Sequence, residues 1–66
     1  MKNSIKVERA KLNITQQDLA DKVAVSRQTI NSIETQKYVP STILALKIAA
    51  FFKIQVEQLF ELEEGD

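Results

Sequence analysis

The sequence predicts an all-α fold, a compact bundle of five helices. Apolar residues recur with the 3.6-residue spacing of helices, and the 66 residues contain only one glycine and one proline. No alternating apolar run outside the chain ends is long enough to indicate a strand. A chain of this length forms one domain, residues 1–66, and buries only roughly 60% of its unfolded surface. We therefore expect the protein to act through its surface.

The first two helices are indicated by their ends. Helix 1 is predicted over Ser4–Leu12, and Asn13 is its expected stop. Thr15 is a good N-cap for helix 2, and Asp18 places a carboxylate at the positive end of the helix dipole. This pair resembles a capping box in a weaker form. The apolar positions are Ile5, Ala10 and Leu12 in helix 1 and the inward-facing Leu19, Ala20 and Val23 in helix 2.

Helix 3 follows helix 2 after only a few residues. Val25 is an apolar residue of the kind that fills a tight turn, and Ser26 is a second N-cap. The helix is predicted from Arg27 to about Gln36, with Ile30 and Ile33 as its buried pair. Helices 2 and 3 and the short turn between them thus span residues 15–36, and the other face of helix 3 is polar.

Two further helices complete the bundle. Pro40 and Ser41 start helix 4, whose segment ILALKIAAFF is apolar almost all round apart from Lys47. Such a helix is expected at the centre of a small bundle. A short helix 5 is predicted over about Gln55–Phe60.

The formal net charge of zero conceals a segregation of signs along the chain. Residues 57–66, which end in the acidic tail 61–66, hold five of the nine acids and no base. Residues 1–56 therefore hold nine bases against four acids, a surplus of +5. This segment could face a polyanion. The alternative, an ordinary domain with a solvated acidic terminus, is equally compatible with the charge alone.

The residue types that are missing narrow the function classes. The chain has no cysteine and no histidine, which argues against disulfide staples, common zinc sites and Cys/His catalysis. Its acids are scattered, and it has neither a nucleophile with a base partner nor a glycine-rich phosphate loop, so we expect no enzyme and no cofactor. No membrane span or signal peptide is apparent, and a cytoplasmic, nucleoid-associated protein is expected.

The order of these segments resembles a known family. TQQDLA is followed by VAVSRQTINSIE, a loop ending in Pro40, and the apolar LALKIAAFF and VEQLF. The chain from about Ile5 to Phe60 is similar to the small Cro/lambda-repressor-like (XRE-type) helix-turn-helix regulators. Short one-domain members of the cytolysin-repressor type are the most similar in length. The resemblance implies a five-helix dimer whose chain ends can form a small antiparallel pair of strands.

In such a fold, helix 3 enters the major groove of double-stranded DNA while helix 2 crosses the phosphate backbone. The resemblance and the side-chain chemistry together assign base contacts to four residues of helix 3. Arginine can donate two hydrogen bonds to guanine, and glutamine or asparagine can pair with adenine. If they do not contact bases, these residues are solvated polar positions of an amphipathic helix. The expected base contacts are Arg27, Gln28, Asn31 and Ser32.

Phosphate contacts are expected around helix 3. Gln16 lies at the N-terminus of helix 2, where free backbone N–H groups also favour an anion, and the alternative role is local capping of that helix. Ser26 and Thr29 could donate hydroxyls to phosphate, although Ser26 could equally be occupied with capping. Lys37 and Tyr38 lie in the loop that similar proteins place along the backbone.

The resemblance also implies structural roles and one departure. Arg9 and Glu34 match positions that form an ion pair between helices 1 and 3 in similar proteins. Leu59 and Phe60 are expected in the dimer interface, and the alternative is that they belong to the core. Gln36 replaces a glycine that many members have there, so we expect helix 3 to end differently, at a cost of about 1 kcal/mol.

The function predicted from these features is sequence-specific DNA binding. We expect a transcriptional repressor that binds a palindromic operator as a homodimer. A protein antagonist is a plausible release mechanism, because so small a domain has no room for a ligand pocket. The alternative is an antitoxin or another helix-turn-helix module that binds a protein partner through the tail or helix 5, and the sequence separates the two poorly.

Overall fold

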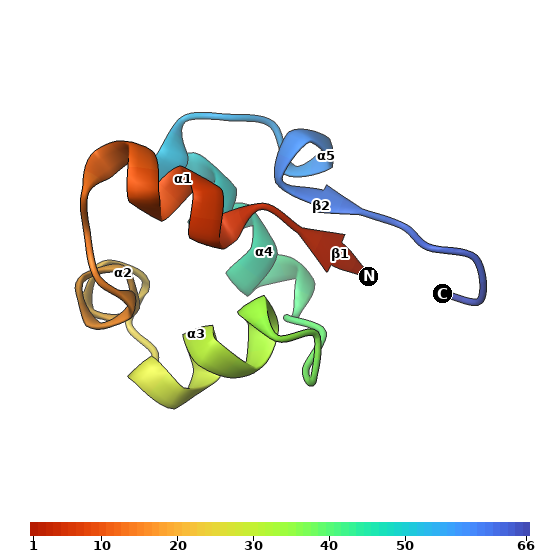
Figure 1. Cartoon of the computed structure of the whole chain (residues 1–66), viewed down its shortest axis with the longest axis horizontal. Coiled ribbons are helices and arrows are strands. Elements are labelled where there is room, and N and C mark those ends of the chain that lie inside the picture. The colour runs from red at the N-terminus through yellow and green to blue at the C-terminus, as the bar shows by residue number, and fades with distance from the viewer.

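A computed structural model describes all residues 1–66 as five helices and two short strands (Figure 1). None of the helices combines the length and the apolar character needed to cross a lipid bilayer. The elements are β1 (Lys2–Asn3), α1 (Ile5–Leu12), α2 (Gln16–Val23), α3 (Arg27–Glu34), α4 (Thr42–Phe52), α5 (Val56–Leu59) and β2 (Phe60–Glu61). All five predicted helices are present, and their bounds differ from the predicted ones by at most two residues.

Side-chain caps begin the three helices at the centre of the chain. The Thr15 hydroxyl accepts from the Asp18 N–H at 3.0 Å, and the Asp18 carboxylate accepts from the Thr15 N–H at 3.0 Å. This is a complete capping box, which is stronger than the sequence suggested. Ser26 and Ser41 cap α3 and α4 in the same way through one hydroxyl each.

Four helices end on a residue with a positive φ, and none of these residues is glycine. They are Asn13 (φ 55°), Ala24 (φ 60°), Gln36 (φ 63°) and Lys53 (φ 59°). After α3, the N–H groups of Gln36 and Lys37 donate to the carbonyls of Ile33 and Ser32, which is a Schellman motif. The expectation that Gln36 ends α3 differently from a glycine is therefore corrected. The left-handed turn forms with the bulkier residue.

One apolar core joins all five helices and β2. Six large side chains are less than 2% exposed: Ile5, Leu19, Ile30, Ile33, Ile48 and Leu59. Val25 in the turn packs against this core, as predicted. Of the three apolar positions named in α1, only Ile5 is buried, because Leu12 is 52% exposed and Ala10 is exposed as well. Helix α4 is also not buried all round, since Ile43 and Leu46 are 68% and 53% exposed.

The two ends of the chain lie side by side. Strands β1 and β2 pair antiparallel, with Lys2 opposite Glu61 and Asn3 opposite Phe60, as Figure 1 shows. The acidic tail then turns back toward the N-terminus, where the Met1 amino group lies 3.1 Å from the carboxylate of Asp66 and 3.3 Å from that of Glu63. The small sheet implied by the family resemblance is present.

Candidate nucleic-acid interface

Helices α2 and α3 form a helix-turn-helix at one side of the molecule. The connection consists of residues 24–26 alone. In Figure 1 α2 is seen nearly end-on whereas α3 runs across the view, so the helices cross at a steep angle. Because Ile30 and Ile33 point into the core, the polar face of α3 is turned outward. The fold therefore presents a row of polar side chains on a convex edge.

The first residues of α3 carry unoccupied hydrogen-bonding groups. Arg27 and Gln28 are exposed, and their side chains form no hydrogen bond within the protein. Asn31 lies one turn after Arg27 and is exposed, while Ser32 lies one turn after Gln28 and is half-buried. The four residues expected to contact bases thus form two adjacent rows along one helix.

A shallow groove joins one of these rows to the loop after α3. It is lined by Ser26, Gln28, Thr29, Ser32 and Tyr38. The Tyr38 side chain is 47% exposed, and its hydroxyl has no partner in the protein. Lys37 is exposed beside it, at the end of the Schellman motif. The loop residues expected to contact phosphate therefore lie next to the residues expected to contact bases.

Ser26 is occupied with capping. Its hydroxyl accepts from the Thr29 N–H at 3.1 Å and lies 2.9 Å from the Thr29 hydroxyl. One of the two hydroxyls must use its proton in this contact, so the pair has one free proton to offer to a phosphate. Of the two roles considered for Ser26, capping is the one that the structure displays.

Behind α3, the Arg9–Glu34 ion pair links it to α1. Arg9 donates from Nε to Glu34 Oε2 at 2.7 Å and from Nη2 to Oε1 at 3.0 Å. Its third nitrogen, Nη1, donates to the Ile14 carbonyl at 3.0 Å. The side chains of Arg9 and Glu34 are only 13% and 6% exposed. The hydrogen bonds to Glu34 raise the pKa of Arg9, so the guanidinium stays charged.

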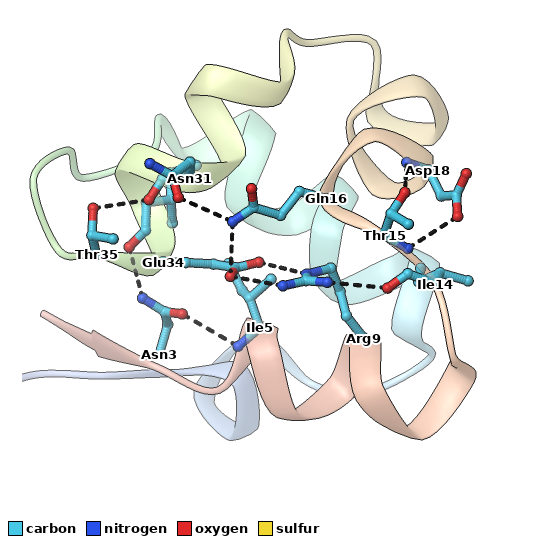
Figure 2. A network of polar contacts seen from close by, with 11 residues as sticks. Asn3, Ile5, Arg9, Ile14, Thr15, Gln16, Asp18, Asn31, Glu34 and Thr35 are labelled. Atoms are coloured by element: carbon cyan, nitrogen blue, oxygen red, sulfur yellow. Dashed lines mark hydrogen bonds and ion pairs between the residues drawn. The ribbon is translucent and has the colours of Figure 1, made fainter.

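Gln16 connects this ion pair to the recognition surface (Figure 2). Its Nε2 donates to Glu34 Oε1 at 3.2 Å and to Asn31 Oδ1 at 3.2 Å. Gln16 was predicted to contact a phosphate or, alternatively, to cap its helix locally. No local pattern indicates that its amide joins an expected base contact to a largely buried carboxylate, because residues 16, 31 and 34 meet only when α2 crosses α3.

Sequence reasoning also missed Asn3. Its Nδ2 donates to the Ile33 carbonyl at 2.9 Å, and its Oδ1 accepts from the Ile5 N–H at 3.2 Å. One side chain therefore anchors β1 to the C-terminal end of α3 and starts α1 (Figure 2). No local pattern indicates such a contact across 30 residues.

Of the two places considered for Leu59 and Phe60, the structure displays the core of the protomer, where they are 1% and 9% exposed. Leu59 therefore offers almost no surface to a second copy, whereas the exposed part of Phe60 lines a surface groove. The exposed apolar residues at the same end of the molecule are instead Val39, Leu46 and Leu62, with 61%, 53% and 77% of their surface exposed.

Comparison with known proteins now decides the family. A family model described as helix-turn-helix matches residues 5–59, most of the chain. The protein belongs to the helix-turn-helix family. It is 53% identical over 66 residues to an uncharacterized HTH-type transcriptional regulator of Methanocaldococcus jannaschii, with 100% of both chains covered. It is 47% identical over 64 residues to the uncharacterized HTH-type transcriptional regulator YgzD of Bacillus subtilis, with 97% of both covered.

A third helix-turn-helix relative, an uncharacterized HTH-type transcriptional regulator of Archaeoglobus fulgidus, is 47% identical over 66 residues. The match covers 100% of this chain and 93% of the relative. Helix-turn-helix regulators of this XRE class bind DNA and are not enzymes. In a helix-turn-helix the second helix is the one that enters the major groove, and α3 is the second helix here.

Proposed function

We propose that the protein is a sequence-specific regulator that represses transcription by binding a palindromic operator as a homodimer. In this proposal it is a short member of the cytolysin-repressor type, and the whole chain acts as one unit in the cytoplasm, at the chromosome. One observation carries the proposal. The two residues that open α3, Arg27 and Gln28, are exposed and have no partner within a complete helix-turn-helix.

Base recognition is assigned to the polar face of α3. Arg27 suits guanine, whose O6 and N7 accept two hydrogen bonds, and Gln28 suits adenine N6 and N7. Asn31 and Ser32 extend the two rows by one turn. An α-helix fits the major groove, which is about 12 Å wide, so these four side chains can reach adjacent base pairs.

Phosphate contacts flank this face. Gln16 at the start of α2 lies beside Asn31. The Ser26–Thr29 hydroxyl pair and Tyr38 line the groove on the side of Gln28 and Ser32, and Lys37 precedes Tyr38 in the loop. Such contacts fix the register of a protein on DNA but carry no sequence information. Because cationic side chains are few in this loop, we expect modest affinity for unrelated DNA and a clear salt dependence.

The dimer is assigned to the end of the molecule that holds both termini. A shallow apolar groove there is lined by Met1, Val39, Pro40, Leu46, Val56 and Phe60. The molecule is 31 Å long, and its long axis runs across Figure 1 toward this end. A twofold axis at the end would place the centres of two copies about 31 Å apart. Half-sites one DNA turn apart are separated by roughly 34 Å.

Repression fits this architecture better than activation. A dimer that occupies one operator blocks a promoter by its presence and needs no further contact. The surfaces assigned here are used by DNA and by the second copy, which leaves little area for recruiting polymerase.

The experiment is selection of binding sites from a random pool of double-stranded DNA. Wild-type protein is expected to enrich a palindrome with half-sites about one turn apart. The Gln28→Ala variant is expected to lose its preference at one base pair per half-site, with a penalty of about 1–3 kcal/mol. Gln55→Ala, at an exposed glutamine before α5, serves as the control and should select the wild-type site. Failure to enrich any sequence would contradict the proposal and favour a protein partner instead.

A further inference from the structure

A surface groove lies between α2 and α4, apart from the apolar groove at the chain ends. We call it the α2–α4 groove, and its lining residues are Lys22, Val23, Ala24, Lys47, Ala50 and Phe51. It shares no residue with the groove assigned to the dimer. Figure 1 places α2 at the end of the long axis away from both chain ends. The proposed dimer therefore leaves the α2–α4 groove open.

The floor of the α2–α4 groove is apolar and open to solvent. Ala24 and Ala50 are exposed, and Phe51 is half-buried. An adjoining hollow, which has Ala24 in common with the groove, continues this surface to Ile43, whose side chain is 68% exposed. Neither the dimer nor base recognition uses Ile43. Apolar side chains that are exposed together mark a surface that binds a partner.

Two lysines make the rim of the α2–α4 groove positive. Lys22 lies in the last turn of α2 and Lys47 in the middle of α4, and both side chains are exposed. Neither forms an ion pair within the protein, and no acid lines the groove. The acids of α2, Asp18 and Asp21, bond to uncharged groups of their own segment. A ligand with carboxylates beside an apolar surface therefore complements this groove in both respects.

We propose that the α2–α4 groove is the docking site of an acidic segment of another protein, one that combines carboxylates with large apolar side chains. The apolar side chains lie on the floor of the groove, and the carboxylates lie beside Lys22 and Lys47. DNA fits less well, because its phosphates match the lysines but not the apolar floor, and because no residue of α3 lines the groove.

A docked segment that extends into the adjoining hollow also covers groups that are expected to contact phosphate. This hollow contains Thr29 and Tyr38 in addition to Ile43. The partner should therefore oppose DNA binding, and the groove would be the site of the protein antagonist expected from the sequence. This consequence rests on the proposed function, whereas the docking itself does not.

The test is selection on wild-type protein from a library of random peptides displayed on phage, followed by fluorescence anisotropy of labelled synthetic peptides. The enriched peptides are expected to combine acidic residues with large apolar ones. Lys22→Glu and Lys47→Glu should each weaken binding by about fivefold, because an attractive pair becomes a repulsive one. The matched control is Lys6→Glu, which makes the same charge change at an exposed lysine of α1 outside the groove and should bind like wild type.

A charge swap separates loss of the site from loss of structure. A peptide whose acids are replaced by lysines should bind the double variant Lys22→Glu/Lys47→Glu more tightly than it binds wild type. The inference is overturned if no acidic apolar peptide is enriched, or if the lysine variants bind the selected peptide as wild type does. Loss of peptide binding in Leu46→Glu would place the peptide in the dimer groove and would overturn the inference as well.

Binding of the selected operator distinguishes a protein site from a DNA contact. Lys22→Gln and Lys47→Gln should leave the salt slope of operator binding unchanged. A slope smaller by about one in each variant would make the lysines phosphate contacts and overturn the inference while the repressor proposal stands. Saturating peptide should lower the affinity of wild-type protein for the operator several-fold, and an unchanged affinity would contradict the antagonist role.

The proposed function can fail separately. A protein that enriches no DNA sequence but still binds an acidic apolar peptide through Lys22 and Lys47 would overturn the repressor proposal and leave the docking site standing. A change of oligomeric state in Lys47→Glu, measured by sedimentation equilibrium, would instead make the groove an interface between copies and overturn the inference. Circular dichroism of each variant confirms that its helices are intact.

Discussion

At the scale of single residues, the half-buried Arg9–Glu34 pair fixes the position of α3. The guanidinium uses all three nitrogens, two on Glu34 and one on the Ile14 carbonyl. Such a pair has a small net effect on stability, because the hydrogen bonds offset the desolvation of two charges. Loss of one partner is more damaging, because the other charge then stays buried without compensation.

We therefore predict that Arg9→Met lowers the free energy of unfolding by about 3 kcal/mol. The double variant Arg9→Met/Glu34→Leu should recover most of this loss, because it leaves no unpaired charge. Urea unfolding followed by circular dichroism measures both values. A single variant as stable as wild type would show that Glu34 finds solvent easily and that the pair does not fix α3.

The carboxylate of Asp18 makes the folding stability of the protein depend on pH in the acid range. The hydrogen bond from the Thr15 N–H and then that from its hydroxyl lower the pKa of Asp18 below the ordinary 3.8. A carboxyl group with a lower pKa in the folded state contributes stability above its unfolded pKa. This contribution is lost as the pH falls through the folded value.

The Asp18→Asn variant should accordingly be less stable than wild type at neutral pH, and the difference should disappear as the pH falls below 3.8. The quantity to follow is the difference in free energy of unfolding between wild type and variant at each pH. The pKa of Asp66 is also lowered, and its effect is present in both proteins and cancels in this difference. A gap that stays constant down to the lowest pH would contradict this assignment of the capping box.

At the scale of the elements, the helix starts follow the sequence closely, whereas among the left-handed helix ends only Asn13 was marked in the sequence. Thr15, Ser26 and Ser41 each mark a cap because their hydroxyls act on the next turn of the same helix. The left-handed ends at Ala24, Gln36 and Lys53 carry no such mark, because the residues there are not those that favour a positive φ. The tertiary packing that follows each turn must stabilise them.

Glycine at these ends should therefore stabilise the protein. We predict that Gln36→Gly raises the free energy of unfolding by about 1 kcal/mol, since the positive φ at residue 36 then costs nothing. Ala50→Gly is the control, because Ala50 is an exposed position within α4 and should lose about the same amount. Thermal unfolding of both variants decides the sign, and a destabilised Gln36→Gly would contradict the backbone geometry.

The candidate site shows the same division between local and distant contacts. The polar face of α3 could be read from its sequence, because the spacing of Ile30 and Ile33 fixes which residues point outward. The Gln16 network and the Asn3 anchor could not, because they join residues 15 to 30 positions apart through the crossing of elements. Apolar character alone did not decide between core and interface for Leu59 and Phe60, and the structure buries both in the protomer.

At the scale of the whole molecule, the apolar groove and the polar face of α3 lie on different parts of the surface. Both chain ends and a groove with exposed apolar side chains lie at one end, and the polar face of α3 lies along one side. A second copy placed on that end would present two recognition helices on the same side of the dimer. In the proposed dimer, the position of the apolar groove at the end of the long axis therefore sets the distance between the two half-sites.

This assignment predicts the effect of a charge in the groove. Leu46→Glu should convert the dimer to a monomer, because the carboxylate would be buried against apolar side chains. Ile43→Glu is the matched control, since Ile43 is on the same helix and is more exposed, but does not line the groove. Sedimentation equilibrium distinguishes the two, and a Leu46→Glu variant that remains dimeric would place the interface elsewhere.

The measurement that tests the central claim most directly is a fluorescence anisotropy titration of the selected operator and of a scrambled duplex at two salt concentrations. The account predicts that the operator binds at least about 10³-fold more tightly, and that this ratio survives at the higher salt. Binding to the scrambled duplex should weaken steeply with salt, because phosphate attraction alone supports it. Equal affinities for the operator and the scrambled duplex, both lost at the higher salt concentration, would contradict base recognition by α3.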